Sequence, residues 1–213
     1  MVTPPSGSAG SLRLTFSAMR DEGRSGGQAP GEPAGTLSDA QLIALARESH
    51  AEAFELLYAT YKGRLYGFLL RMVGEPELAD DLTQDVFTKA YPLLPKLGHD
   101  HRVLPWLYRV ANNAAIDQLR RRRRFTWLRI GKLAGTDGEP RAADDHGRVP
   151  EQQHVQAVLR TLPPENASAL LLHALEGYSY KEIAEIQGVT MTAVRSRIAR
   201  ARSAFRERYE PER

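Results

Sequence analysis

The 213-residue sequence contains no cysteine. This absence excludes disulfides, thiolate metal sites and cysteine nucleophiles, and it favours a reducing compartment such as the cytoplasm. The sequence also lacks a run of eighteen apolar residues, and its N-terminus has no basic region followed by an apolar core. We therefore expect neither a membrane-spanning segment nor a signal peptide, and we expect a cytoplasmic protein.

Strand patterns are missing as well. No stretch alternates polar and apolar residues for long enough to form a β-strand, and no segment is repeated. Apolar residues recur instead at intervals of three and four, most clearly along residues 54–72 and 78–90. Ser38, Ser49 and Ser179 each have Gln or Glu three residues later, the spacing of a capping box that starts a helix. The sequence therefore predicts an all-α protein.

The composition divides the chain into four parts. Residues 1–36 are dominated by Gly, Pro, Ser and Ala, and they are too poor in apolar residues to fold, so we expect a disordered N-terminal tail. Residues 126–150 combine Gly, Pro and mixed charge without any period, which is typical of a flexible linker. The helical patterns fill residues 37–125 and 151–213. We predict two small helical domains joined by this linker.

Charge is unevenly distributed, although the formal net charge is only +3. Residues 37–100 contain ten acids and six bases (−4), residues 101–125 contain seven bases and one acid (+6), and residues 177–213 contain eight bases and five acids (+3). The second block includes five consecutive arginines at 120–124. An acidic block followed by two basic blocks suggests one surface for a protein and two for a polyanion.

Residues 178–206 contain the most specific pattern, two helical segments around a turn. Ala184, Gly188 four residues later and Val194 six residues after that have the spacing of a helix-turn-helix. In a helix, successive residues turn by about 100°. The second segment therefore has an apolar stripe on one side and a polar face on the other. That face carries Thr192, Arg195, Ser196, Ala199, Arg200 and Ser203, with Arg197 and Arg202 at its flanks. Arginine binds guanine through two hydrogen bonds and suits phosphates, so we predict a DNA-reading helix; the alternative is an amphipathic helix with a solvated face.

Another predicted helix, at residues 76–91, has one acidic face. That face carries Asp80, Asp81, Gln84, Asp85 and Thr88. Paired carboxylates occur in acid–base and metal catalysis, but no histidine or further acidic cluster stands at a ligand spacing, so we expect neither a catalytic residue nor a metal site. The sequence His99-Asp100-His101 is weak evidence for a metal site. The remaining interpretations are a solvated face and a docking surface for a basic partner helix.

Four segments of the chain occur in an order typical of one protein family. They are ADDLTQDVF (79–87), PWLYRVANNAAIDQLRRRRR (105–124), LRTLPPENASALLLHALEGYSYKEIAEIQGV (159–189) and TAVRSRIARAR (192–202). Together they resemble the bacterial extracytoplasmic-function sigma factors of RNA polymerase, over about residues 40–125 and 152–207. The resemblance implies that residues 37–125 form sigma region 2 and residues 151–213 form sigma region 4, without any cofactor.

The resemblance also implies roles for individual residues of the first domain. The acidic face, through Asp80, Asp81, Gln84 and Asp85, would contact the clamp helices of the largest subunit of core polymerase. The loop at 98–104 and the helix after it would open the minus-ten promoter element and hold an unstacked base. The contacts implied there are His99, His101, Arg102, Arg109, Asn112 and Asn113, with Arg120 and Arg123 on the same side of the helix. Trp106 and Tyr108 would either stack on a base or belong to the core.

The second domain would recognise the minus-thirty-five element. The residues implied are Thr192, Arg195, Ser196, Arg197, Ala199 and Arg200. The chain departs from the usual family sequence at Gln187, where an apolar residue is common, and at residues 190–193. Family habit implies an anti-sigma partner. We expect a non-enzymatic sigma factor that directs core polymerase to promoters and promotes DNA melting; the alternative is a helix-turn-helix regulator that acts without core polymerase.

Overall fold

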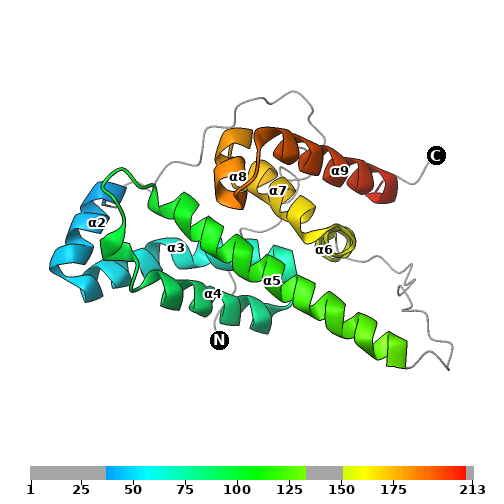
Figure 1. The fold of residues 1–213 in the computed structure, drawn as a ribbon, viewed down its shortest axis with the longest axis horizontal. Coiled ribbons are helices and arrows are strands. Elements are labelled where there is room, and N and C mark those ends of the chain that lie inside the picture. The colour runs from blue at the N-terminus through cyan, green and yellow to red at the C-terminus, as the bar shows by residue number, and fades with distance from the viewer. Residues whose placement is uncertain (1–36, 133–150, 210–213) are drawn as a thin grey trace.

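The computed structural model describes residues 37–132 and 151–209, and every regular element in these two ranges is helical (Figure 1). The tail at 1–36, residues 133–150 of the expected linker and residues 210–213 lie outside the described residues. The N-terminal domain consists of α2 (Asp39–Glu48), α3 (His50–Val73), α4 (Pro76–Ala90), the 3₁₀ helix η1 (Leu94–Lys96) and α5 (Val103–Lys132). The C-terminal domain consists of α6 (Glu151–Thr161), α7 (Pro164–Ala174), α8 (Tyr180–Gln187) and α9 (Met191–Tyr209). The prediction of an all-α fold with two helical domains is confirmed.

Two of the three expected capping boxes are formed. The Ser38 hydroxyl accepts a hydrogen bond from the backbone N–H of Gln41, and the Gln41 side chain accepts one from the backbone N–H of Ser38. The same reciprocal pair joins Ser179 and Glu182 at the start of α8. Each box satisfies N–H groups that have no partner inside the helix, and so fixes where the helix begins.

The third box, expected between Ser49 and Glu52, is absent. Ser49 is the N-cap of α3, but its side chain makes no capping hydrogen bond. The same residue ends α2, where its N–H donates to the carbonyl of Leu45 at 2.7 Å. Because one residue joins the two helices, its backbone has to serve both helix ends, and the prediction of a box here was wrong.

Helix α5 is longer than the sequence analysis indicated. We expected a linker from residue 126 onward, but the helix runs from Val103 to Lys132. Residues 126–132, TWLRIGK, contain no proline and a single glycine, so little in them opposes a helix. At 1.5 Å per residue, the helix of 30 residues is about 45 Å long.

The two domains pack against one another. Helices α3 and α5 of the N-terminal domain contact α6, α7 and α8 of the C-terminal domain, which lie over α5 in Figure 1. The buried apolar residues of both domains belong to one continuous cluster. Within the described ranges, no helix is both long enough and apolar enough to cross a membrane. This packing brings the C-terminal domain onto the helix that carries the five arginines.

Candidate nucleic-acid interface

The turn between α8 and α9 depends on Gly188. Its φ of +64° is a left-handed conformation that other residues disfavour. The N–H of Val189 then donates to the carbonyl of Ala184 at 2.9 Å, which closes the C-terminal end of α8. Ala184 and Val194 are both buried, as the spacing required. The predicted helix-turn-helix is confirmed.

Helix α9 has one buried and one exposed side. Its apolar stripe is buried and consists of Val194, Ile198, Ala201 and Phe205. The predicted reading face divides in two, because Thr192, Arg195, Ala199 and Arg200 are exposed whereas Ser196 and Arg197 are half-buried. The exposed set projects hydroxyl and guanidinium groups from one face of α9, as major-groove recognition requires.

Gln187 explains why Arg197 is half-buried. The Gln187 Nε2 donates to the main-chain oxygen of Glu165 at 3.2 Å and to the Ser168 hydroxyl at 3.1 Å. Its Oε1 accepts a hydrogen bond from Arg197 Nη1 at 2.7 Å. A polar side chain is useful at this position because it provides a partner for the fully buried Ser168 and ties α9 to α7.

The acidic face of α4 is open to solvent. Asp81, Gln84 and Asp85 are exposed, while Asp80 is half-buried and accepts a hydrogen bond from Gln84 Nε2 at 2.9 Å. The other side of α4 is buried through Ala79, Leu82, Val86 and Ala90. Within the described residues, no three His, Asp or Glu side chains gather in a way that could hold a metal ion. The face is therefore a row of polar groups without an enclosed site.

The residues predicted for the minus-ten element divide into two groups. Four of them, His99, His101, Arg109 and Asn113, are exposed. His101 and Arg109 line a crevice of about 420 Å³ together with the half-buried Trp106. The other four, Arg102, Asn112, Arg120 and Arg123, contact the C-terminal domain.

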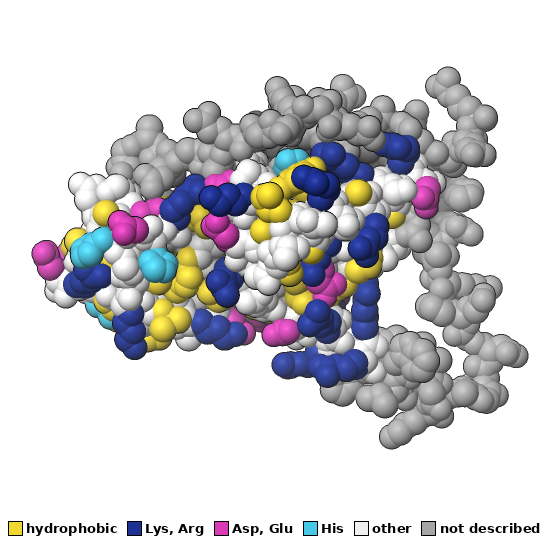
Figure 2. Space-filling model, turned by 45° about the horizontal axis from the view of Figure 1, so that its top comes forward, with side chains coloured by type: hydrophobic (Ala, Val, Ile, Leu, Met, Phe, Trp, Pro, Cys, Tyr) yellow, Lys and Arg dark blue, Asp and Glu magenta, His cyan; other side chains and the backbone are white. Residues whose placement is uncertain are grey.

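Two arginines of this second group pair with glutamates of the C-terminal domain. Arg102 forms an ion pair with Glu182 of α8. Arg120 donates from Nε and Nη2 to Oε1 of Glu165, at 3.0 and 2.6 Å. Figure 2 shows that Lys and Arg side chains on the visible face are interleaved with Asp and Glu. Arg102 and Arg120 are therefore each neutralised by a glutamate of the C-terminal domain.

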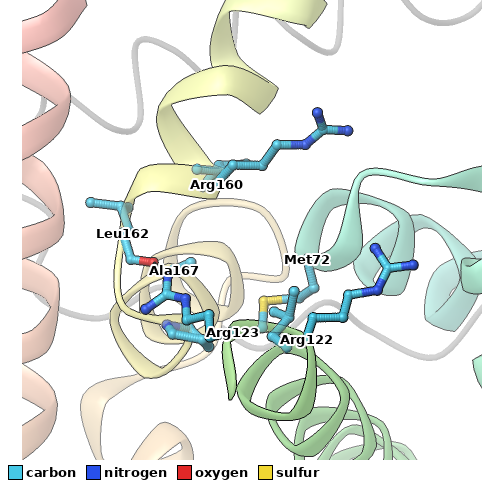
Figure 3. Close-up of a pocket in the computed structure, with 9 residues that line it drawn as sticks. Met72, Arg122, Arg123, Arg160, Leu162 and Ala167 are labelled. Carbon is cyan, nitrogen blue, oxygen red and sulfur yellow. Dashed lines mark hydrogen bonds between the residues drawn. The ribbon is translucent and has the colours of Figure 1, made fainter. Parts of the chain in front are cut away.

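The other two members of the group contact the C-terminal domain without an ion pair. Asn112 is only 1% exposed, and its Oδ1 accepts a hydrogen bond from the buried Ser168 hydroxyl. Arg123 Nη2 donates to the main-chain oxygen of Leu162 at 2.8 Å, and Figure 3 shows the guanidinium turned toward it. The sequence analysis named Asn112 as a minus-ten contact, whereas in the structure α7 covers its side chain.

Tyr108 belongs to the core, one of the two alternatives expected for it. The ring is fully buried, and the hydroxyl donates to Glu176 Oε2 at 2.5 Å. Arg64 Nη2 lies 3.5 Å from the same carboxylate oxygen. Burial, together with the negative charge of Glu176, raises the pKa of the Tyr108 hydroxyl far above its ordinary value. The neutral phenol is thus a fixed donor between the domains.

The five arginines at 120–124 point in different directions. Arg122 forms an ion pair with Glu75 at the start of α4, and this bond lowers the pKa of the Glu75 carboxyl. Arg121 and Arg124 are exposed. With Arg120 and Arg123 held by the C-terminal domain, the run is not a single basic patch.

Comparison with known proteins matches both domains. Residues 57–125 match the family model described as sigma-70 region 2, and residues 152–205 match sigma-70 region 4. The chain is 33% identical over 161 residues to the RNA polymerase sigma factor CarQ of Myxococcus xanthus, which covers 76% of this chain and 91% of that protein. It is 30% identical over 186 residues to the ECF RNA polymerase sigma-E factor of Haemophilus influenzae, which covers 82% of this chain and 97% of that protein.

The chain belongs to the extracytoplasmic-function sigma factors. The structure of the sigma factor RpoE in complex with the anti-sigma factor NepR from Bartonella quintana has the same fold, with a TM-score of 0.58 and 24% identity over 75% of this chain and 98% of that chain. The protein is therefore an RNA polymerase sigma factor that directs core polymerase to promoters and promotes DNA melting at initiation.

Sequence reasoning missed several polar residues that join the two domains. Glu165, Ser168 and Glu176 of region 4 contact region 2, but they carry no motif of their own. Glu182 was identified only as part of a capping box. The acidic character of the three glutamates was a signal, yet helical periodicity cannot indicate which distant helix a side chain meets.

Proposed function

We propose that this sigma factor binds core polymerase through the acidic face of α4 and promoter DNA through two surfaces. The loop at 98–104 and α5 would engage the minus-ten element, and α9 would engage the minus-thirty-five element. The protein would act in the cytoplasm and contribute no catalytic residue. The observation that carries the proposal is that α4 exposes Asp81, Gln84 and Asp85 on a rigid helix separate from the arginines of α9. A regulator that acts on DNA alone would need the arginines of α9 but no acidic face on α4.

The charge on α4 indicates the chemistry of its partner. Three carboxylates of the face lie within two turns of a helix whose opposite side is anchored in the core. Exposed carboxylates at fixed positions attract a basic helix and orient it during encounter. Asp80 is the least exposed of the three and holds Gln84 by a hydrogen bond, so Asp81 and Asp85 are the outer contacts.

Charge reversal tests the docking surface. In the variant Asp81→Lys/Asp85→Lys, affinity for core polymerase should fall roughly tenfold or more, because like charges would then meet across the interface. The matched control is Glu48→Lys/Glu55→Lys, which changes the net charge equally at exposed residues of α2 and α3. Surface plasmon resonance with immobilised core polymerase measures both. Equal affinities of the two variants would refute the docking assignment.

Promoter-dependent transcription tests the function itself. Core polymerase mixed with the full-length protein and a promoter library should produce transcripts that begin at a defined set of sites. Core polymerase alone provides the background. The absence of both transcripts and core binding would contradict the proposal, whereas DNA binding without core binding would favour the helix-turn-helix regulator.

Base recognition is expected from α9. Replacing Arg195 or Arg200 by Ala should cost about 1–3 kcal/mol at one base pair if that arginine contacts guanine through two hydrogen bonds. Affinities for a series of single-base-pair variants of the selected promoter measure this cost. An equal loss on every sequence would assign the arginine to phosphate instead.

We also propose a protein partner that holds this sigma factor inactive. The support is the likeness in fold to RpoE of Bartonella quintana, whose structure is a complex with the anti-sigma factor NepR. The tagged chain is purified from its own cells before and after promoter activation, and the proteins bound to it are identified. The proposed partner should be bound before activation and absent after it.

A further inference from the structure

The apolar cluster that joins the two domains leaves a pocket of about 330 Å³ between α3, α5, α6 and α7 (Figure 3). We propose that this pocket binds a small amphiphilic anion, an aliphatic carboxylate of medium chain length. The aliphatic chain would lie among the apolar side chains of the pocket, and the carboxylate would lie at the arginines of its rim. The inference goes beyond the proposed function and uses none of the promoter or polymerase contacts.

The inner wall of the pocket is apolar and comes from both domains. It consists of Met72, Leu119, Leu159, Leu162, Pro164 and Ala167. All of these side chains except Leu119 are buried. Buried water normally makes about three hydrogen bonds, and aliphatic side chains offer none. An apolar ligand, in contrast, gains free energy in proportion to the apolar surface that it removes from water.

The rim of the pocket is basic. It carries Arg122 and Arg123 of α5 and Arg160 of α6. Arg122 pairs with Glu75, whereas Arg123 and Arg160 each donate to a main-chain oxygen at 2.8 Å. Among the residues that the structure describes, no carboxylate lies within ion-pair distance of Arg123 or Arg160. Three guanidinium groups therefore face one carboxylate, and the excess of two positive charges favours an anionic ligand.

Arg160 is the best-placed contact for the head group. Its residue is exposed, and one of the five N–H donors of its guanidinium is used by the main-chain oxygen of Gly74. Figure 3 shows Arg160 and Arg122 extended to the same side of the pocket, whereas Arg123 turns to the other side, toward Leu162. Arginine binds carboxylates through parallel hydrogen bonds. The carboxylate of the ligand would therefore lie beside Arg160, with Arg122 next to it.

The volume of the pocket limits the length of the ligand. A CH₂ group occupies roughly the volume of one water in the liquid, about 30 Å³, so the pocket holds on the order of ten non-hydrogen atoms. Octanoate, with eight carbons and two oxygens, has this size. Octan-1-ol would fill the same apolar space without a charge for Arg160, and octylammonium would bring a cation to a basic rim. The pocket should therefore prefer the carboxylate.

A ligand in the pocket would contact both domains at once. Met72 and Leu119 belong to the N-terminal domain, whereas Leu159 and Leu162 belong to the C-terminal domain. A ligand that binds the folded protein but not the unfolded chain raises the stability of the fold. We therefore expect this sigma factor to be more stable in the presence of aliphatic carboxylates.

Binding is tested with three probes that share one chain length. Isothermal titration calorimetry of the full-length protein measures the affinities for octanoate, octan-1-ol and octylammonium. Octanoate should bind about tenfold more tightly than either of the others, because its head group makes charge-assisted hydrogen bonds. At ten times its dissociation constant, octanoate should also raise the midpoint of thermal unfolding by about 3–5 °C. Circular dichroism measures this midpoint.

Two variants assign the binding to this pocket. Arg160→Gln removes the head-group contact, so the affinity for octanoate should fall about tenfold while that for octan-1-ol stays unchanged. The matched control is Arg124→Gln, at an exposed arginine of α5 outside the lining of the pocket. Ala167→Met extends a flexible side chain from the wall into the cavity, and it should weaken the binding of both octanoate and octan-1-ol.

Equal affinities for octanoate and octan-1-ol would overturn the inference, as would equal effects of Arg160→Gln and Arg124→Gln. Absence of octanoate binding to the wild-type protein would also overturn it, and is the result expected if water, a second copy or another part of this chain fills the pocket. If Ala167→Met does not fold, Arg160→Gln still decides the question, because it changes an exposed residue and leaves the apolar wall intact.

Discussion

Tyr108 is the residue that most clearly links the two domains. Its ring packs edge-on against Phe68 of region 2 and Tyr178 of region 4, with centroids 5.4 and 5.5 Å apart. Its hydroxyl donates a hydrogen bond to Glu176, and Arg64 lies near the same carboxylate. A buried phenol with a carboxylate partner has to remain protonated. Only the neutral form of Tyr108 therefore stabilises the folded protein.

This protonation requirement predicts the effect of Tyr108→Phe. The free energy of unfolding at pH 7 should fall by about 2 kcal/mol, because the half-buried Glu176 loses a donor. The pKa of Tyr108 is raised from its ordinary 10.0, so its contribution is complete below pH 10 and is lost as the pH rises above that value. Between pH 9 and 11 the free energy of unfolding of the wild type should fall more steeply than that of Tyr108→Phe. The difference in slope should be up to about 1.4 kcal/mol per pH unit.

Urea unfolding at pH 7, 9 and 11 measures these differences. Tyr66→Phe, at a half-buried tyrosine of α3, is the control for the loss of a phenol. Parallel pH profiles for the wild type and Tyr108→Phe would show that the Tyr108 hydroxyl is not held in the neutral form.

At the scale of elements, two glycines illustrate how context sets the effect of one substitution. Gly188 ends α8 with a φ of +64°, whereas Gly63 lies inside the regular helix α3. Neither position has an atom within 4 Å of the place where a Cβ would be. Backbone conformation, and not space, therefore distinguishes them.

Alanine at the two glycines should have opposite effects on stability. Gly188→Ala should lower the free energy of unfolding by about 1 kcal/mol, because alanine is strained in the left-handed region. Gly63→Ala should raise it by about 0.5–1 kcal/mol, since alanine is the better helix former. Thermal and urea unfolding of both variants give the two signs, and a stabilising Gly188→Ala would contradict the account of the turn.

Elements were the level at which sequence reasoning was most successful. Caps at Ser38 and Ser179 and the buried stripe of α9 follow from signals within a few residues of each other. The end of α5 was misplaced because residues 126–132, which contain no proline, precede a segment rich in glycine and proline and were assigned to it.

At the scale of the whole molecule, the prediction was less complete. The exposure of Asp81 and Asp85 follows from the period of one helix, so it could be foreseen. The burial of Asn112 and the pairing of Arg120 depend on how α7 lies on α5, across more than forty residues of sequence. A helical period defines the faces of an element, but it contains no information on which distant element covers a face.

The packing of the two domains against each other should depend on pH. Burial opposes ionisation of Glu165 and Glu182, but hydrogen bonds from backbone N–H groups and from Arg120 and Arg102 outweigh it, so both pKa values lie below the ordinary 4.5. Lowered carboxylate pKa values stabilise the packed arrangement of the two domains above pH 4.5, and this contribution is lost as the pH falls below it. The radius of gyration should be constant from pH 8 to about 5 and should rise below about 4.5.

Scattering across this range, with circular dichroism to verify that the helices persist, measures the transition. The variant Glu165→Gln/Glu182→Gln lacks the titrating groups and should show no corresponding step. A step of equal size in the variant would assign the transition to other carboxylates.

The carboxylate of Glu182 divides its two oxygens between two tasks. Oε2 accepts hydrogen bonds from the Ser179 N–H and hydroxyl, at 2.9 and 2.8 Å, while Oε1 accepts from Arg102. Without Arg102, Oε2 would keep its hydrogen bonds with Ser179, and water could take the place of the guanidinium at Oε1. The start of the helix-turn-helix is therefore independent of the contact between the two domains.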